Sequence, residues 1–321
     1  MPELDPAAPV PPPLIPTSTL EPVDLVAAVE GPEEAEAERA ARRGRLGIGG
    51  TAALSWLVLV VALALLAPVL PIDDPNESIA SIAKQGPGTE GHLLGGDGLG
   101  RDVLSRVIWG SRATLLLAVS AVLLGLIVGG ALGLVAGYFR GRADTGLTGL
   151  FDVLLSFPQL ILAVTLVTVF AGGGVSSTRR MIVLILALGV VSIPVLGRIT
   201  RASTLSWCQR EFVTASRAIG ARNRSIIIGE VLPNVLPAMF SIALLGIAVV
   251  IVAEGGLSLL GVGIQLPTPS WGNMIAEGRS DLRDAPYIVM VPTIAIFLTV
   301  LALNYLGDIV RARFDVRESA L

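Results

Sequence analysis

The sequence has very little cysteine, histidine, aromatic side chain and charge. It contains one cysteine (Cys208) and one histidine (His92) in 321 residues, which excludes an internal disulfide and argues against a Cys/His metal site. Charged residues form 15 % of the chain, whereas soluble domains carry about 25 %. Aromatic residues form only 5 %, so leucine, valine, isoleucine and alanine supply most of the 53 % that is hydrophobic. This composition excludes a disordered protein, a disulfide scaffold and an ordinary soluble enzyme, and it is typical of a polytopic helical membrane protein.

The first 38 residues contain no lysine or arginine. They hold nine acids and nine of the 21 prolines, so the rest of the chain keeps 17 acids and all 23 bases, a net charge of +6. Such an acidic, proline-rich segment cannot bury enough apolar surface to fold. We therefore predict a disordered cytoplasmic tail over residues 1–45. It lacks the basic start and short apolar run of a secretory signal.

Six stretches are long and apolar enough to cross a bilayer as helices, which takes roughly 20 residues each. They lie at about 50–70, 113–137, 147–171, 181–199, 236–262 and 286–307. With both termini in the cytoplasm, 15 of the 23 basic residues fall on the cytoplasmic side and eight outside, as the positive-inside rule favours. The sequence therefore predicts an all-α membrane protein with six transmembrane helices and cytoplasmic termini.

About 40 residues separate the first two predicted spans. Within them, residues 101–108 place Val103, Leu104 and Val107 at helical spacing, with Asp102 and Arg106 on the other side. This pattern predicts an amphipathic helix that lies along the membrane surface ahead of the second span. We interpret it as a connector, and direct binding of substrate by its charges is the alternative.

The longest cytoplasmic loop, about 200–235, has an apolar face that a solvated connector does not need. Residues 209–219 predict a short amphipathic helix, which Gly220 ends because glycine readily adopts positive φ. A second helical stretch, 222–231, is expected to end at Leu232-Pro233. We call residues 209–233 the knob, and we expect its apolar face to dock in a groove of a partner protein.

The knob resembles the cytoplasmic loop of permease subunits in binding-protein-dependent ABC importers. That loop has the pattern Glu-Ala-Ala, three residues, Gly, nine residues, Ile-x-Leu-Pro. Here residues 214–216 stand at the triplet, Gly220 at the glycine and Leu232-Pro233 at the end. Three positions depart from the pattern, including Thr214 in place of glutamate, so a specific glutamate salt bridge with the ATPase is not implied. The resemblance assigns an ATPase-coupling role to Glu211, Thr214, Ala215, Ser216, Arg217, Gly220, Glu230, Leu232 and Pro233.

Two further segments resemble the dipeptide, oligopeptide and nickel permeases of this class. HLLGGDGLGRDVLSRVIWGSR (92–112) is similar to their His-x-x-Gly-Thr-Asp…Gly-Arg-Asp…Ser-Arg signature, with Gly96 in place of threonine. EGGLSLLGVGIQLPTPSWGNMIAEG (254–278) is similar to a segment that follows their fifth span. The three motifs occur in the expected order, the likeness covers about residues 46–315, and the layout resembles the second, C-type permease subunit.

The resemblance implies a type I ABC importer permease fold in a bacterial cell membrane. The implied partners are a second permease subunit, two cytoplasmic ATPase domains and an extracytoplasmic binding protein. The chain has no G-x-x-x-x-G-K-[ST] phosphate loop, so we expect no enzymatic activity or cofactor here, and ATP and Mg²⁺ on the partner ATPase. Peptides are the first expected substrate, and nickel or another small solute is the alternative. An ion-coupled secondary transporter and a structural membrane subunit are the remaining alternatives, and nucleic acid is not an expected partner.

The expected organisation is a tail (1–45), a first span with its outer loop (46–112), and a permease core (113–315) that contains the coupling loop (200–235). Three residues in or beside the spans are candidates for gating or for the translocation path, because polar groups and proline are costly there. They are Glu254, Asp152 and Pro158. Glu254 is interpreted either as a polar gate or as a hydrogen-bonded carboxylate at a helix end. Pro158 is expected to kink the third span.

Overall fold

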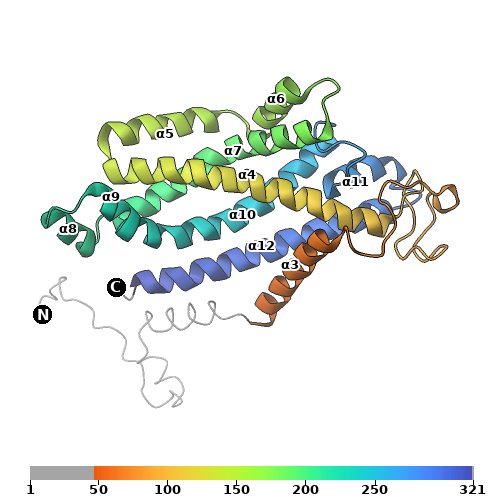
Figure 1. Cartoon of the computed structure of the whole chain (residues 1–321), viewed down its shortest axis with the longest axis horizontal. Coiled ribbons are helices and arrows are strands. Elements are labelled where there is room, and N and C mark those ends of the chain that lie inside the picture. Colours follow the sequence, from red (N-terminus) through yellow and green to blue (C-terminus); the bar gives the residue numbers. More distant parts are fainter. Residues whose placement is uncertain (1–46, 320–321) are drawn as a thin grey trace, which may run out of the picture.

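The computed structural model describes residues 47–319, and side chains as far as residue 312. The tail predicted over 1–45 lies outside the described residues. The described part is helical, and its main helices run roughly along one axis (Figure 1). The α-helices of the described part are α3 (Ile48–Leu66), α4 (Val103–Phe139), α5 (Gly141–Ser156), α6 (Gln159–Ala171), α7 (Ser177–Trp207), α8 (Glu211–Ala218), α9 (Asn223–Ile226), α10 (Leu232–Leu259), α11 (Trp271–Gly278) and α12 (Tyr287–Ser319), and the long α4, α7, α10 and α12 follow that axis (Figure 1).

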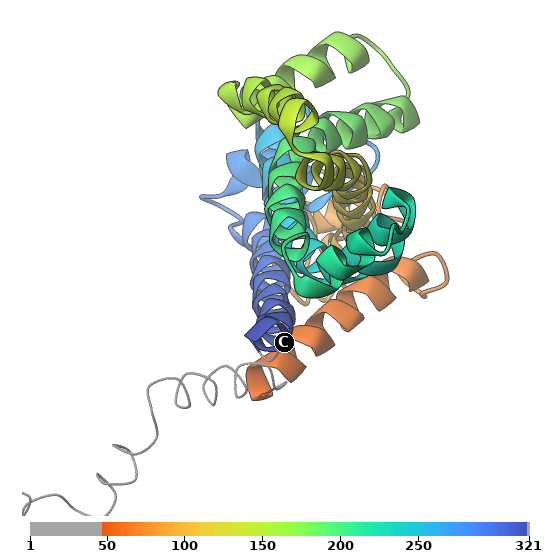
Figure 2. The same cartoon turned by 90° about the vertical axis from the view of Figure 1, so that its left-hand side faces the viewer.

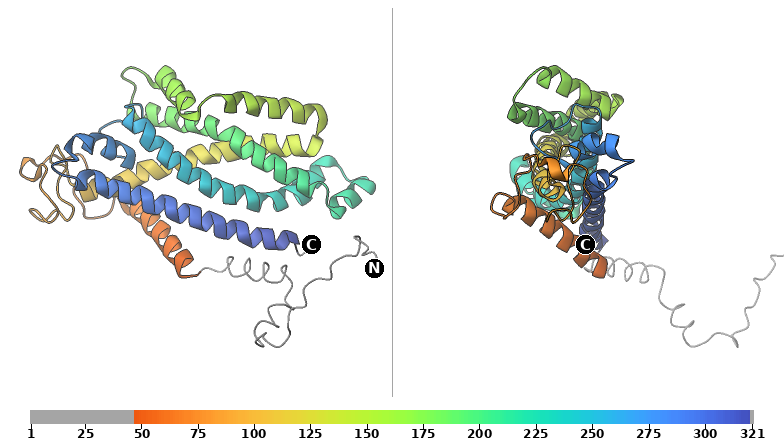
Figure 3. Two further views of the ribbon diagram at one scale, coloured as in Figure 1. Left: turned by 180° about the vertical axis from the view of Figure 1, so that it is seen from behind. Right: turned by 90° about the vertical axis from the view of Figure 1, so that its right-hand side faces the viewer.

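The two ends of the bundle carry different structures. At one end, the knob end, α8 and α9 extend beyond the long helices, and α12 finishes nearby (Figure 1). At the other end, the loop end, residues 67–102 and α11 lie together. α3 and the α5–α6 pair lie on opposite sides of the bundle, as Figures 1 and 2 show from two directions. The view from behind shows α10 and α12 running side by side (Figure 3), and these two helices are in contact.

Five of the described helices are long and apolar enough to cross a membrane, and the count is six if α5 and α6 form one bent span. This confirms the predicted class of multi-span helical protein. α5 and α6 meet at an angle of 84° at Phe157-Pro158, so the kink expected at Pro158 is a full break in the span. Proline has no backbone N–H, and the residue before it is pushed into extended geometry, which Phe157 adopts.

Two predicted boundaries were wrong. Residues 103–108 do not form a separate surface helix, because α4 runs without interruption from Val103 to Phe139. Asp102 is the N-cap of this helix, and the helix contains no proline that would end it early. At the knob, the chain does not leave the helix at Leu232-Pro233. A π-helical turn, Ile227–Val231, leads directly into α10, and Pro233 is tolerated because it stands in the first turn of α10.

α4 and α7 form the most extensive helix pair, and glycine makes their close approach possible. Gly125, Gly129, Gly133 and Gly137 recur every fourth residue along one face of α4. A Cβ atom on Gly129 or Gly133 would collide with a backbone carbonyl of α7, that of Ile193 or Gly197. Helices in lipid lack a hydrophobic drive toward each other, so close contact of this kind is a main source of their association.

Replacing Gly133 by alanine should destabilise the bundle by about 1–3 kcal/mol, the usual cost of overpacking against atoms that cannot move aside. Cys208 supplies the measurement, because it is the only thiol and is 3 % exposed. Burial also raises the pKa of the Cys208 thiol, which lowers its reactivity in the folded protein. The temperature at which a thiol-reactive dye labels the chain should fall by several degrees.

Gly149→Ala is the matched control for this substitution. Gly149 lies on the exposed side of α5 with open space around it, so alanine there should leave the labelling temperature unchanged or slightly higher. Equal labelling temperatures for Gly133→Ala and Gly149→Ala would contradict the close packing of α4 on α7.

Candidate functional site

The knob is a helix, a glycine turn and a short second helix. α8 begins at Glu211 and ends at Ala218, and Gly220 follows at φ +81°, where a side chain would be strained. Two backbone hydrogen bonds close the turn, from Gly220 to Arg217 (3.1 Å) and from Ala221 to Ser216 (3.0 Å). Helices that are followed by a glycine commonly end in this way, with backbone N–H groups beyond the helix donating to carbonyls of its last turn. The glycine turn predicted from the sequence is therefore confirmed.

Specific side chains fix the knob to the bundle. The Tyr138 hydroxyl, at the end of α4, donates to Asn223 Oδ1 in α9 at 2.9 Å, and the Arg217 guanidinium lies 5.0 Å from the centre of the Tyr138 ring. Ser216 in α8 donates to Glu230 in the π-helical turn at 2.6 Å. Val213, Ile226 and Val231 are fully buried beneath these contacts. The knob is thus held by α4 on one side and is continuous with α10 on the other.

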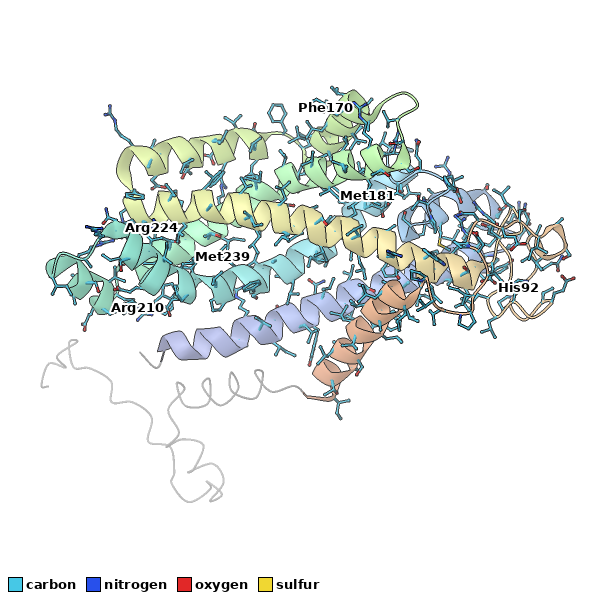
Figure 4. All side chains as sticks on the ribbon, viewed as in Figure 1. His92, Phe170, Met181, Arg210, Arg224 and Met239 are labelled. Carbon is cyan, nitrogen blue, oxygen red and sulfur yellow. The ribbon has the colours of Figure 1, made fainter. Side chains whose placement is uncertain are left out.

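Apolar and basic side chains face outward from the knob. Ile219 is 85 % exposed, and Phe212 and Ile228 are also exposed. Arg222 and Arg224 are exposed next to the glycine turn, and Arg224 is labelled at this end in Figure 4. Exposed apolar groups rimmed by charge are typical of a surface that binds another protein.

The structure brings most of the predicted coupling residues together. Glu211, Thr214, Ala215 and Arg217 are exposed on α8, and Gly220 is exposed in the turn. Ser216 and Glu230 are half-buried and hydrogen-bonded to each other. Leu232 and Pro233 begin α10 instead of ending the knob.

Two ion pairs join α5 to α7 on the knob side of the broken span. Asp152, a predicted gating residue, pairs with Arg198, and both side chains are about half exposed. Asp144 receives two hydrogen bonds from Arg201, one of them from Nη2 at 2.7 Å. Pro158 follows at the break, one residue before α6 begins. α5 is therefore tied to α7 by charge pairs and separated from α6 by proline.

Glu254 is fully buried near the loop end of α10. Its Oε1 accepts hydrogen bonds from Ser258 (2.8 Å) and Ser270 (3.0 Å). Gly272, in the first turn of α11, approaches so closely that a Cβ there would lie 2.6 Å from Glu254 Oε2. The carboxyl group therefore joins α10 to the start of α11, and no described contact joins it to Asp152 or Pro158.

The loop end is held by a buried network of ion pairs. Asp97 accepts hydrogen bonds from the backbone of Leu99 and from the backbone and side chain of Arg101. Arg101 also pairs with Glu277 in α11 at 2.8 Å, and Arg106 in α4 reaches the same carboxylate at 3.3 Å. A cavity of about 300 Å³ lies beside this network. The charges of the 92–112 segment therefore fasten the loop to α4 and α11.

Sequence reasoning missed the residues that anchor the knob, α5 and the loop. Tyr138, Asn223 and Arg201 had no assigned role, although the three-residue spacing of Arg198 and Arg201 places both on one face of α7. Their partners are far away in the sequence, so periodicity alone could not pair them. His92, assigned no chemistry, lies between Asp73 and Asp102.

A family model and several known proteins match this chain. Residues 129–319 match the family described as binding-protein-dependent transport system inner membrane component. The glutathione transport system permease protein GsiD of Pectobacterium atrosepticum is 37 % identical over 245 residues, which cover 76 % of this chain and 79 % of that protein. The dipeptide transport system permease protein DppC of Alkalihalophilus pseudofirmus is 36 % identical over 239 residues, covering 74 % and 76 %.

A solved structure shares the fold. An inward-facing form of the MetNI methionine ABC transporter contains a chain that superposes with a TM-score of 0.54 at 20 % sequence identity. The match covers 64 % of this chain and 95 % of that one. The helical arrangement is therefore that of a type I ABC importer permease, as the sequence predicts.

Replacing Asp97 by asparagine should lower the stability of the loop end by about 3–5 kcal/mol, because it leaves Arg101 and Arg106 buried with too little negative charge. Thermal unfolding, followed by intrinsic tryptophan fluorescence, measures the loss. Trp271 stands in the same helix as Glu277, donates from Nε1 to the carbonyl of Val107 next to Arg106 (3.0 Å), and is 1 % exposed, so it reports on this region. Asp284→Asn, the same charge change at an exposed site of the loop end, should have no effect. Equal unfolding temperatures for the two variants would refute the role of the network.

Proposed function

Because this chain belongs to the family of binding-protein-dependent transport system inner membrane components, we propose that it forms half of the translocation pathway of an ATP-driven importer of di- or oligopeptides. It is a multi-pass membrane protein and the permease component of a transport system that has other subunits. The ATPase of such a system is a separate subunit, so this chain is not the enzyme.

The proposed substrate class rests on the names of two relatives. The relatives that share 36–37 % of their residues with this chain over about three quarters of its length are named as glutathione and dipeptide permeases. Glutathione is itself a tripeptide-like molecule, so both names describe small peptides. The match to the family, residues 129–319, includes most of the candidate membrane spans, and the spans are where a permease contacts its substrate.

The proposed partners are a second permease subunit, a pair of ATPase domains that bind ATP and Mg²⁺, and an extracytoplasmic binding protein. We assign the knob end, with both termini, to the cytoplasm. The excess of arginine in the loops on that side supports this orientation. The exposed Phe212 and Ile219 on the knob support docking of an ATPase there, since a solvated loop gains nothing from such residues.

The knob is proposed to transmit movement of the ATPase pair to the spans. Tyr138 links it to the end of α4, and the π-helical turn links it to α10 without a loop. A displacement of α8 is therefore shared by two helices that extend to the loop end. A rigid-body shift of this kind biases a two-state assembly between inward- and outward-facing forms.

The three gating candidates have different proposed roles. Pro158 is a hinge between α5 and α6, because the backbone hydrogen bonds are interrupted there. The ion pair between Asp152 and Arg198 holds α5 against α7. Glu254 keeps α11 attached to α10 at the outer end, through Ser258 and Ser270.

Reconstitution of the complete transporter tests the substrate class. The chain, its permease partner, the ATPases and the binding protein are placed in liposomes, and uptake of labelled di- and tripeptides is compared with uptake of nickel chelates. We expect ATP-dependent uptake of peptides, and none of nickel. Uptake of nickel chelates alone would instead establish the small-solute alternative.

Ala215→Pro tests the coupling role. Proline in the middle of α8 removes a backbone donor and costs about 3 kcal/mol locally, so it should break the helix without touching the spans. In the reconstituted transporter we expect substrate-stimulated ATP hydrolysis to lose its link to uptake, with uptake lowered at least tenfold.

Ala215→Ser is the control, because it changes the same exposed position and preserves the helix. It should transport at close to the wild-type rate. Normal uptake by Ala215→Pro, in protein that unfolds at the wild-type temperature, would exclude α8 from coupling.

A further inference from the structure

Three side chains of the metal-binding type meet at the loop end. His92 Nδ1 lies 3.0 Å from Asp102 Oδ1 and 3.4 Å from Asp73 Oδ2, and the three ligand atoms all lie within 4.8 Å of one another. All three lie in the 67–102 loop but at different points along it: Asp73 shortly after α3, His92 further on, and Asp102 at its end, where it caps α4. Figure 4 labels His92 among the loop residues at this end.

The spacing of these atoms suits a small divalent ion. In tetrahedral zinc sites the metal lies about 2.0–2.2 Å from each nitrogen or oxygen, so neighbouring ligand atoms are roughly 3.3–3.6 Å apart. The two separations from His92 Nδ1, 3.0 Å to Asp102 and 3.4 Å to Asp73, are close to this range. The Asp73 side chain is 55 % exposed and therefore has room to turn toward an ion.

Hydrogen bonds hold the three residues in place without any help from an ion. Asp102 Oδ2 accepts from the backbone of Ser105 at 2.6 Å, which directs Oδ1 toward His92. The Ser105 hydroxyl donates to the carbonyl of Asp73 at 2.5 Å, and so joins the segment after α3 to the first turn of α4. His92 is fixed by backbone bonds to Thr89 (2.9 Å) and from Gly95 (3.2 Å). Preformed ligands of this kind lower the cost of binding a metal.

The charge of the cluster is not balanced by other residues. The nearby acids Asp97 and Glu277 pair with Arg101 and Arg106. By contrast, no lysine or arginine in the described part of the chain pairs with Asp73 or Asp102. Asp102 is nevertheless buried, and a buried carboxylate requires compensation. A divalent cation would neutralise both carboxylates, whereas a protonated imidazole would neutralise only one.

We propose that Asp73, His92 and Asp102 bind a divalent transition-metal ion of the zinc type, with water completing its coordination. An imidazole nitrogen with two carboxylates selects such an ion over Mg²⁺ or Ca²⁺, which prefer oxygen alone. The ion joins the segment that follows α3 to the start of α4. This inference differs from the sequence expectation of no metal site, because only the fold brings Asp73 and Asp102 to the single histidine.

Zinc binding to two asparagine variants tests the proposal. The full chain, purified without a polyhistidine tag, is placed in lipid nanodiscs, stripped with a chelator and titrated with Zn²⁺. The wild type should bind one more zinc ion per chain than Asp73→Asn, or bind it at least tenfold more tightly. Asp74→Asn makes the same charge change one residue away, where Oδ1 accepts from Asn76, and should bind zinc as the wild type does.

A second variant and a second readout separate loss of a ligand from loss of fold. His92→Gln should also abolish the extra zinc ion, and zinc should raise the unfolding temperature of the wild type and Asp74→Asn only. Co²⁺ in place of Zn²⁺ should give a visible absorption band in the same two proteins. Equal zinc binding by wild type, Asp73→Asn and His92→Gln, or none by the wild type at micromolar zinc, would overturn the proposal. The histidine–aspartate hydrogen bond would then account for the cluster by itself.

Discussion

The contact between α4 and α7 is the constraint on which the rest of the fold depends. Gly129 and Gly133 bring the backbones of these helices together, and no larger residue fits there. α4 then presents Tyr138 to the knob at one end and Asp102, Ser105 and Arg106 to the loop at the other. One closely packed helix pair therefore positions both the knob and the loop end.

The two ends of the bundle use charge in opposite ways. At the loop end, Arg101 and Arg106 are buried and paired with carboxylates, an arrangement that fixes a single geometry when every group has a partner. At the knob end, Arg222 and Arg224 are exposed beside the apolar Ile219. The arginines of the loop end thus find their partners within the chain, whereas those of the knob stand on a surface that a partner protein can match.

The sequence predicts the helices and the knob well, because apolar length and a glycine turn are local signals. It placed the spans near their observed positions and Gly220 at its turn. The errors were at junctions: Arg106, on the polar face of residues 101–108, is buried and donates to the distant Pro75 and Glu277. The meeting of Asp73, His92 and Asp102 could not be predicted either, since it depends on how a loop folds back on a helix cap. Such contacts between distant segments leave no periodicity in the sequence.

The length of α4 has a consequence for its relation to the bilayer. Its 37 residues span about 55 Å at 1.5 Å per residue, whereas the hydrocarbon core is about 30 Å thick. The helix contains no proline, so it meets a thinner or thicker membrane by changing its tilt as a unit. Because α7 packs closely against α4, the two helices tilt together. Tyr138 and Asp102 stand at opposite ends of α4, so a tilt moves them in opposite directions. Lipid thickness therefore acts on the knob and on residues 67–102 together, through the inclination of one unbroken helix.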